Sequence, residues 1–295
     1  MRAEAFQLTN ADIDYAFENN HFEIVFQPIF NLRTGRPARA EAFVRWMHPG
    51  LGVLPPGVFI PFLESQGRIG ELTRYVLRSA LRARRTLRLG DDAPSISVNL
   101  SPPLDLAEPA FAPQIEILLR EANCPPAALT LECEAPDSLD EVDKYLRRLA
   151  PLTQIDVRLA LEARGRSGDM LGALSPFPFA EVKTGGPAIL RFAKTVRGPG
   201  LSAVSALLDF AEKSRVDTVA VGVEDEESLR ALSSLGFTMA QGNLLARPAA
   251  ALGLDADAIA AAGERLGGPA EDDPTEATLA EDPGFPLTNQ PSPEQ

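Results

Sequence analysis

Almost every predicted strand ends at or near a polar side chain of a type that could do chemistry. The types are carboxylates, side-chain amides and one lysine. If the strands run parallel around one sheet, their carboxyl ends share one rim and these side chains converge. Oxygen ligands that converge with a lysine suit a hard divalent cation and a phosphodiester. In chain order the residues are Gln27, Glu41 with Arg45, Asn99, Glu132, Glu162, Lys183 and Gln241.

One loop of this predicted rim carries two arginines. The stretch LALEARGRSG, residues 159–168, begins as a buried strand, reaches an acid at Glu162 and then turns. The carboxylate could hold a metal ion. Arg164 and Arg166 could clamp a phosphate through bidentate hydrogen bonds, contact another protein, or form a solvated turn. The residues alone leave these roles open.

Strand-like and helix-like patterns alternate along the chain. The first two strands are joined by the turn-rich NLRTGRP and are predicted to form an antiparallel hairpin. Helical patterns follow, for example at 68–90, where Gly90 is a stop signal, and at 201–214 and 225–236. Such units predict an α/β fold, a modified (β/α)8, TIM-like barrel with an antiparallel first strand pair. The predicted strands span 22–30, 38–47, 95–101, 129–133, 156–162, 179–184, 217–223 and 237–243.

Composition excludes several classes of partner. The 295 residues carry a formal net charge of −13, whereas nucleic-acid polymers and anionic membranes are bound by basic faces. No apolar run approaches the roughly 20 residues of a membrane span, which predicts no membrane insertion. The first residues lack the apolar core of a signal peptide, so we expect a cytoplasmic protein.

The C-terminal residues differ from the rest of the chain. From about Ala270 onward the sequence is rich in proline and acids and contains neither lysine nor arginine. Such a segment buries too little apolar surface to offset its ordering entropy. We therefore expect a barrel domain at 1–250, a short helical extension at 251–269 and an acidic, proline-rich disordered tail at 270–295. The tail could improve solubility or dock a partner.

Six segments of the chain together resemble a known family. They are residues 26–67, VNLSP at 98–102, LTLECEA at 129–135, VKTG at 182–185, residues 221–237, and QGNLLARP at 241–248. In this order and spacing, over about residues 5–250, the chain resembles the EAL-domain family of cyclic di-GMP phosphodiesterases. The motif that names the family is here Glu41-Ala42-Phe43. The resemblance implies the EAL variant of the strand–helix barrel, and cyclic di-GMP hydrolysis with two Mg²⁺ or Mn²⁺ ions.

The resemblance also implies roles for single residues. Glu41, Asn99 and Glu132 match metal-binding positions, and Lys183 matches the lysine near the attacking water. The positions expected to bind the nucleotide are Gln27, Glu41, Phe43, Arg45, Gln241 and Pro248.

Several positions depart from the family pattern. Where the family has a pair of aspartates, this chain has Glu162, whose oxygens lie one methylene further out, and Ala163. Three further acids of the family are replaced by Ala135, Gly185 and Val221. A two-metal mechanism needs carboxylates that hold two cations about 3.5–4 Å apart. We therefore expect most of the hydrolytic activity to be lost, with Glu41, Glu162 and Lys183 as catalytic remnants.

The leading hypothesis is a catalytically inactive EAL-type protein, a degenerate member of the family that acts as a cyclic di-GMP-binding effector or signalling scaffold. It would work through an unidentified protein partner or a homodimer, and no cofactor would be required. The first alternative is a weak phosphodiesterase that produces linear pGpG with Mg²⁺ or Mn²⁺. The second is an interaction scaffold that no longer binds the nucleotide.

Overall fold

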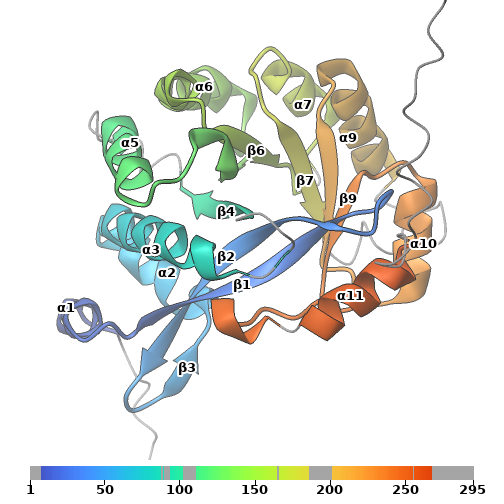
Figure 1. Ribbon diagram of the computed structural model, residues 1–295. Helices are drawn as coiled ribbons and strands as arrows, with labels where there is room; N and C mark the ends of the chain where they lie inside the picture. The colour runs from blue at the N-terminus through green and yellow to red at the C-terminus, as the bar shows by residue number, and fades with distance from the viewer. Residues whose placement is uncertain are drawn as a thin grey trace, which may run out of the picture.

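Among the described residues of the computed structural model, eight strands close into a barrel with helices around the outside (Figure 1). The described residues are 8–87, 89, 94–101, 111–164, 166–185, 201–254 and 256–267, with the backbone alone at 201 and 202. The barrel strands are β1 (Phe22–Asn31), β2 (Pro37–His48), β4 (Ser95–Leu100), β5 (Leu129–Glu134), β6 (Arg158–Glu162), β7 (Glu181–Gly185), β8 (Asp217–Val221) and β9 (Met239–Gln241).

The first strand closes the ring. β1 pairs antiparallel with β2 on one side and with β9 on the other, whereas β2, β4, β5, β6, β7, β8 and β9 follow one another in parallel. The predicted barrel with an antiparallel first pair is therefore confirmed. The short strand β3 (Gly52–Leu54) adds to β2 outside the ring. The carboxyl ends of the parallel strands lie at one rim.

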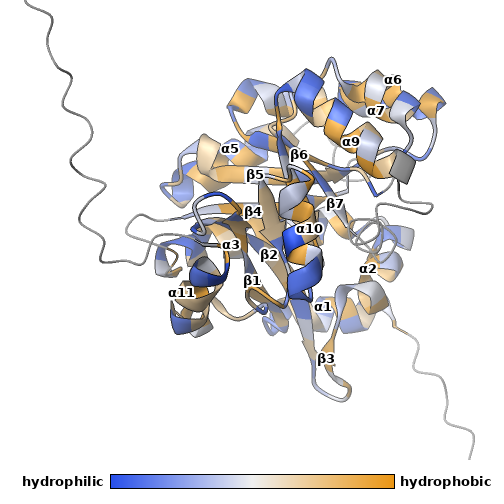
Figure 2. Cartoon of the chain, turned by 90° about the vertical axis from the view of Figure 1, so that its right-hand side faces the viewer, coloured by the Kyte–Doolittle hydropathy of each residue, from blue (hydrophilic) through white to orange (hydrophobic). Residues whose placement is uncertain are grey.

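Apolar side chains on both sides of the strands build the core. In β5 the first five residues are all buried, as expected for a parallel strand that faces the barrel interior on one side and helices on the other. In α3, Ile69, Leu72 and Val76 are buried at spacings of three and four residues. Figure 2 shows hydrophilic residues on the outer side of α10.

The helices that surround the barrel differ in length. No described helix is long and apolar enough to cross a membrane. Their bounds are α1 (Asn10–Glu18), α2 (Pro56–Ser65), α3 (Ile69–Ala83), α5 (Phe111–Glu121), α6 (Val142–Leu149), α7 (Gly168–Leu174), α9 (Leu201–Ser214), α10 (Glu226–Ser234) and α11 (Ala256–Arg265).

Some predicted bounds were wrong. The helix expected at 68–90 ends at Ala83, because a 3-10 turn follows and Arg84 turns inward to donate to the carbonyl of Pro94 at 2.6 Å. The strand expected from residue 156 begins at Arg158, since Asp156 adopts a left-handed conformation with φ of 56°. Gly90 lies outside the described residues.

Part of the C-terminal extension expected at 251–269 is helical. A 3-10 turn at Ala251–Gly253 precedes α11, whose Arg265 pairs with Glu226 of α10 at 3.0 Å. The proposed division into domains stays a prediction. The acidic segment 270–295 lies outside the described residues.

Candidate functional site

The carboxylate of Glu41 is the centre of a hydrogen-bonded cluster inside the barrel. The Lys183 ammonium donates to Glu41 Oε2 at 2.7 Å and to Glu132 Oε2 at 2.5 Å. Asn99 Nδ2 donates to Glu41 Oε1 at 2.8 Å, and Gln241 Nε2 donates to Glu41 Oε2 at 3.0 Å. The five side chains come from β2, β4, β5, β7 and β9. The convergence expected at the strand ends is therefore present for these five residues.

Burial and charge make the two carboxylates of the cluster unlike each other. Burial alone would raise the pKa of Glu41, but the charge and hydrogen bonds of Lys183, with those of Asn99 and Gln241, hold that pKa below its ordinary value. Burial and the nearby charge of Glu41 raise the pKa of Glu132 to about 7. Burial would lower the pKa of Lys183, but the two carboxylates raise it. Glu41 and Lys183 thus form a charged pair, while Glu132 holds a proton more readily.

The resemblance implies that divalent metal ions bind at this cluster. The oxygen atoms of the cluster suit such ions only in part. Glu132 Oε1 is buried and has no hydrogen-bond partner among the described residues, so one oxygen is free to accept a cation. The Lys183 ammonium, however, already lies between Glu41 and Glu132. Within the described part of the chain, no three His, Cys, Asp or Glu side chains are grouped to hold a metal ion. The described residues do not fit a two-metal centre.

Four positions at which the resemblance implies acids lie near the ends of the strands that carry this cluster. Gly185 and Val221 are paired neighbours on β7 and β8. Ala163 is buried, and its N–H donates to the carbonyl of Lys183 at 2.8 Å. Ala135 is buried directly after β5, where its N–H donates to the carbonyl of Glu162 at 3.0 Å. None of these four side chains supplies an oxygen.

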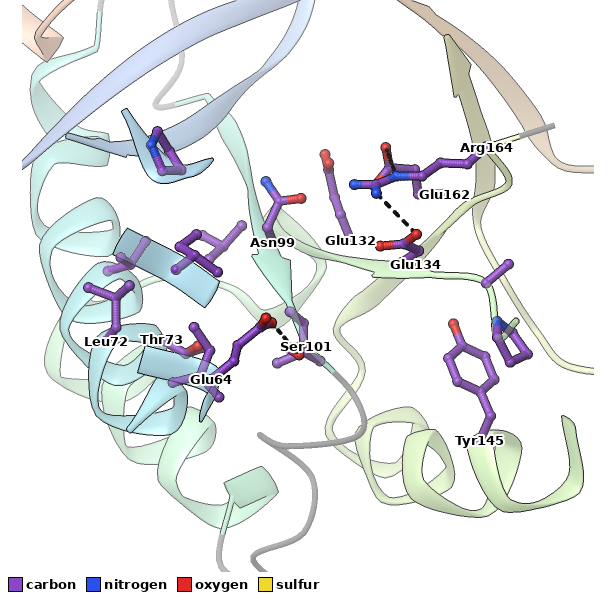
Figure 3. A pocket seen from close by; sticks show the side chains of 18 of the residues that line it. Glu64, Leu72, Thr73, Asn99, Ser101, Glu132, Glu134, Tyr145, Glu162 and Arg164 are labelled. Carbon is purple, nitrogen blue, oxygen red and sulfur yellow. Dashed lines mark hydrogen bonds and ion pairs between the residues drawn. The ribbon is translucent and has the colours of Figure 1, made fainter. Parts of the chain in front are cut away.

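The first arginine of the loop after β6 points back over its own strand. Arg164 Nε lies 3.1 Å from Glu162 Oε1, and Arg164 Nη1 lies 3.1 Å from Glu134 Oε1 of β5 (Figure 3). Its φ of 41° is in the left-handed region. Burial would lower the pKa of Arg164, but Glu162 and Glu134 raise it. Glu162 therefore has an arginine partner within the chain.

The second arginine reaches the loop after β5. Arg166 Nη2 lies 2.5 Å from Asp137 Oδ1 and 3.2 Å from the carbonyl of Ala135. Ser167 begins α7, where its hydroxyl accepts a hydrogen bond from Met170 N at 3.3 Å. Arg166 thus joins the loop after β6 to the loop after β5, and Arg164 joins the loop after β6 to the end of β5. The sequence offered no local signal for the partners, since they lie about 30 residues away.

The residues expected to contact the nucleotide lie on β1, β2 and the segment after β9. Gln27 is the register partner of Glu41 across β1 and β2, and its Nε2 donates to the carbonyl of Ala246 at 2.9 Å. The guanidinium carbon of Arg45 lies 5.7 Å from the centroid of the Phe43 ring. Arg45 Nη1 donates to the carbonyl of Val44 at 2.9 Å. Pro248 is partly buried.

A pocket of about 860 Å³ opens beside the cluster (Figure 3). Its polar side includes Asn99, Glu132, Glu162 and Arg164, and Phe43 also lines it. The lining residues that had not been singled out from the sequence include Glu64, Tyr145 and Arg148.

Two of these additional lining residues bear on the pocket's polarity. Glu64 Oε1 accepts from Ser101 Oγ at 3.5 Å. The hydroxyl of Tyr145 is buried without a hydrogen-bond partner in the described part of the chain, and burial, together with Cys133 and Glu134, raises its pKa. The pocket therefore offers both a carboxylate and a hydroxyl away from the Glu41 cluster.

Comparison with protein families places this arrangement among known folds. The family model of the EAL domain matches residues 10–248 of this chain. The cyclic di-GMP phosphodiesterase RocR of Pseudomonas aeruginosa is 29% identical over 238 residues, which are 81% of this chain and 60% of RocR. An uncharacterized protein of Mycobacterium tuberculosis strain H37Rv is 33% identical over 231 residues, 77% of this chain and 75% of that protein.

Solved structures agree with the family match. The chain resembles the PaMucR phosphodiesterase, solved as a complex with c-di-GMP, with a TM-score of 0.72 and 28% identity over 82% of this chain and 97% of that one. The fold also matches the EAL domain of Xanthomonas citri FimX, with a TM-score of 0.70 and 22% identity over 83% of this chain and 95% of that one. The resemblance on which the site expectations rest is thereby confirmed.

Proposed function

Because the chain belongs to the EAL-domain family, we propose that it binds cyclic di-GMP without hydrolysing it and signals through protein contacts. The observation that carries the proposal is the position of Lys183, whose ammonium lies 2.7 Å from Glu41 and 2.5 Å from Glu132. In this arrangement a single internal cation bridges the two carboxylates. No cofactor is then required to organise the site.

Loss of hydrolysis follows from the chemistry of the missing oxygens. Two cations about 3.5–4 Å apart need bridging or adjacent carboxylates on both. Ala163, Gly185 and Val221 offer none, and the longer side chain of Glu162 is held by Arg164 at 3.1 Å. A misplacement of about 1 Å can lower a rate on the order of 100-fold, so a site rebuilt from the remaining acids would be slow.

Retained binding is supported by the pocket and by the relatives. Arg45 and Phe43 lie on β2 beyond Glu41, towards the rim that the pocket occupies, and Phe43 lines the pocket. A guanidinium can donate two hydrogen bonds to a phosphate, and an aromatic ring can pack under a purine. Gln241 donates to Glu41, and Gln27 is the register partner of Glu41 on β1. RocR is described as a cyclic di-GMP phosphodiesterase, and the PaMucR phosphodiesterase was solved as a complex with c-di-GMP.

One observation favours a weak, single-metal phosphodiesterase as a second candidate. Glu132 Oε1 is buried and lacks a partner among the described residues, so it could bind one Mg²⁺ or Mn²⁺ ion together with Glu41 and Asn99. That binding would require Lys183 to leave its place between the two carboxylates. The product would be linear pGpG.

A third candidate is a scaffold that binds no nucleotide. It is favoured by the engagement of Arg164 and Arg166 with carboxylates of the chain itself, which leaves fewer cations for a ligand phosphate. Under this candidate, as under the first, the protein partner is unidentified and a homodimer is one form of the assembly.

Calorimetric titration with cyclic di-GMP, in the presence and absence of Mg²⁺, separates the three candidates. The proposal predicts binding with the same Kd, within about twofold, in both conditions. Arg45→Ala should weaken it by about 1.5–3 kcal/mol, the usual magnitude of a hydrogen bond to a charged group. Binding that requires Mg²⁺ would support the single-metal enzyme. No binding at millimolar ligand would leave the scaffold.

A further inference from the structure

A second buried ion pair joins the same two strands as the Glu41–Lys183 pair. Arg39 of β2 pairs with Glu181 of β7, and their side chains are 5% and 0% exposed. Arg39 stands two residues before Glu41, and Glu181 stands two residues before Lys183. Side chains two apart on a strand share a face, so both pairs lie inside the barrel, one layer apart. The charges are reversed between the layers.

A third strand repeats the correspondence. In the upper layer Glu41 is bonded to Gln241 of β9 at 3.0 Å, and in the lower layer Arg39 Nη1 reaches Met239 Sδ, two residues earlier on β9, at 3.6 Å. Arg39 thus connects β2 to β7 and β9, as Glu41 does. The lower layer supports the strands that hold the cluster.

Stability of the fold is a poor explanation for this lower pair. A fully buried ion pair is often no more stabilising than apolar residues of the same size. The pair is also incompletely satisfied, since Arg39 Nε and Glu181 Oε2 have no hydrogen-bond partners among the described residues. An apolar layer like that of Ile29 and Val219, which pack beside Met239, would fill the same space.

Charge is what the lower pair contributes to the cluster above it. In the described barrel interior, Glu41, Glu132 and Glu181 are opposed by two cations, Arg39 and Lys183. Arg39 is thus a buried cation that lies one layer below the two carboxylates that hold Lys183.

We propose that Arg39 is a positioning residue, which through its pairing with Glu181 keeps the Lys183 ammonium bound between Glu41 and Glu132 when no divalent cation is present. The link to ligand binding rests on the proposed function, because an organised cluster is needed beside the nucleotide pocket. The positioning itself does not depend on any ligand.

The full chain labelled with ¹⁵N-lysine allows the Lys183 ammonium to be observed directly. The sequence contains four lysines, and Lys183 is assigned by the loss of its NMR signal in Lys183→Arg. The test variant is R39M/E181M, which replaces the pair by apolar side chains and leaves the interior net charge unchanged. The matched control is R265M/E226M, which removes a surface pair of 3.0 Å. Proton exchange of the Lys183 ammonium and the Kd for cyclic di-GMP are measured for each.

The proposal predicts at least tenfold faster Lys183 proton exchange and at least tenfold weaker nucleotide binding in R39M/E181M, with neither changed in the control. R39K, which keeps the positive charge, should restore slow exchange, whereas a merely structural role would alter only the melting temperature. If R39M/E181M does not fold, Glu181→Gln serves as the test variant. This substitution leaves Arg39 without its counter-charge, and the proposal requires that it change the rate of Lys183 proton exchange. Lys183 exchange within twofold of the wild type in the folded variant would overturn the proposal. If the wild-type protein binds no cyclic di-GMP, the proposed function is overturned. The role of Arg39 is still decided by the rate of Lys183 proton exchange, which needs no nucleotide.

Discussion

Gly185 and Val221 lie so close on neighbouring strands that a Cβ atom on Gly185 would stand 2.3 Å from Val221 Cγ2 and 2.7 Å from the carbonyl oxygen of Val221. These are two of the positions at which the resemblance implies acids. The glycine and the valine fit each other, so the two departures form one packed unit. An acid at position 185 is incompatible with the present backbone and side chain of Val221.

This packing predicts that Gly185→Ala destabilises the fold. Overpacking a filled site costs about 1–3 kcal/mol, and here part of the clash is with backbone that cannot rotate away. Urea unfolding measures the change. Gly172→Ala is the control, because a Cβ there meets no atom within 4 Å and its position in α7 favours alanine by up to about 1 kcal/mol. Equal stability of the two variants would contradict the account of the Gly185 site.

Glu132 should make the stability of the protein depend on pH. Its pKa in the folded state is about 7, above the ordinary 4.5, so between these values the folded state binds more protons than the unfolded chain. The contribution of Glu132 to stability is therefore full below about pH 4.5 and is lost as the pH rises to about 7. Relative to Glu132→Gln, the wild type should lose on the order of 1–3 kcal/mol over this range. Parallel pH profiles of the free energy of unfolding for the two proteins would refute the assignment.

Arg164 and Arg166 should influence ligand binding more than stability. Their ion pairs are largely exposed, so Arg164→Ala/Arg166→Ala should cost less than about 1 kcal/mol of unfolding free energy. Removing them frees Glu134 and Glu162 at the pocket, where these acids would repel a phosphate. Nucleotide affinity should fall, most strongly at low salt, because exposed charges are screened as ionic strength rises.

Three results of this double substitution distinguish the roles of the loop. A salt-dependent loss of affinity indicates that the arginines offset the pocket acids or clamp the phosphate. Unchanged affinity with loss of a bound protein indicates a partner-contacting loop. The control is Arg265→Ala, since Arg265 is a surface arginine outside the pocket lining. If nucleotide affinity and protein binding in the double variant both match those of this control, Arg164 and Arg166 serve only to join the two loops.

The barrel and the central cluster could be predicted from sequence because their signals are local. Each strand is a short apolar run, and each functional side chain lies within or at the end of such a run, so one assumption about topology brings Glu41, Glu132 and Lys183 together. The bounds of elements were less predictable, since they depend on tertiary contacts such as the hydrogen bond from Arg84 to the carbonyl of Pro94.

Pairings between distant strands could not be predicted. Arg39 and Glu181 are 142 residues apart, and each reads locally as a charged residue within a strand. Likewise, nothing near Arg164 indicates that Glu134 will be its partner. Such pairs depend on the register of the closed barrel, which apolar patterns alone do not specify.

The Lys183 ammonium lies between Glu41 and Glu132, where hydrolysis would require a metal ion. The nucleotide should therefore be bound and left intact. The most direct measurement is chromatography of cyclic di-GMP incubated with the wild-type protein and Mg²⁺ or Mn²⁺, with Glu41→Ala as the control. The account predicts no linear pGpG above the amount formed with Glu41→Ala. Turnover by the wild type that Glu41→Ala abolishes would contradict it.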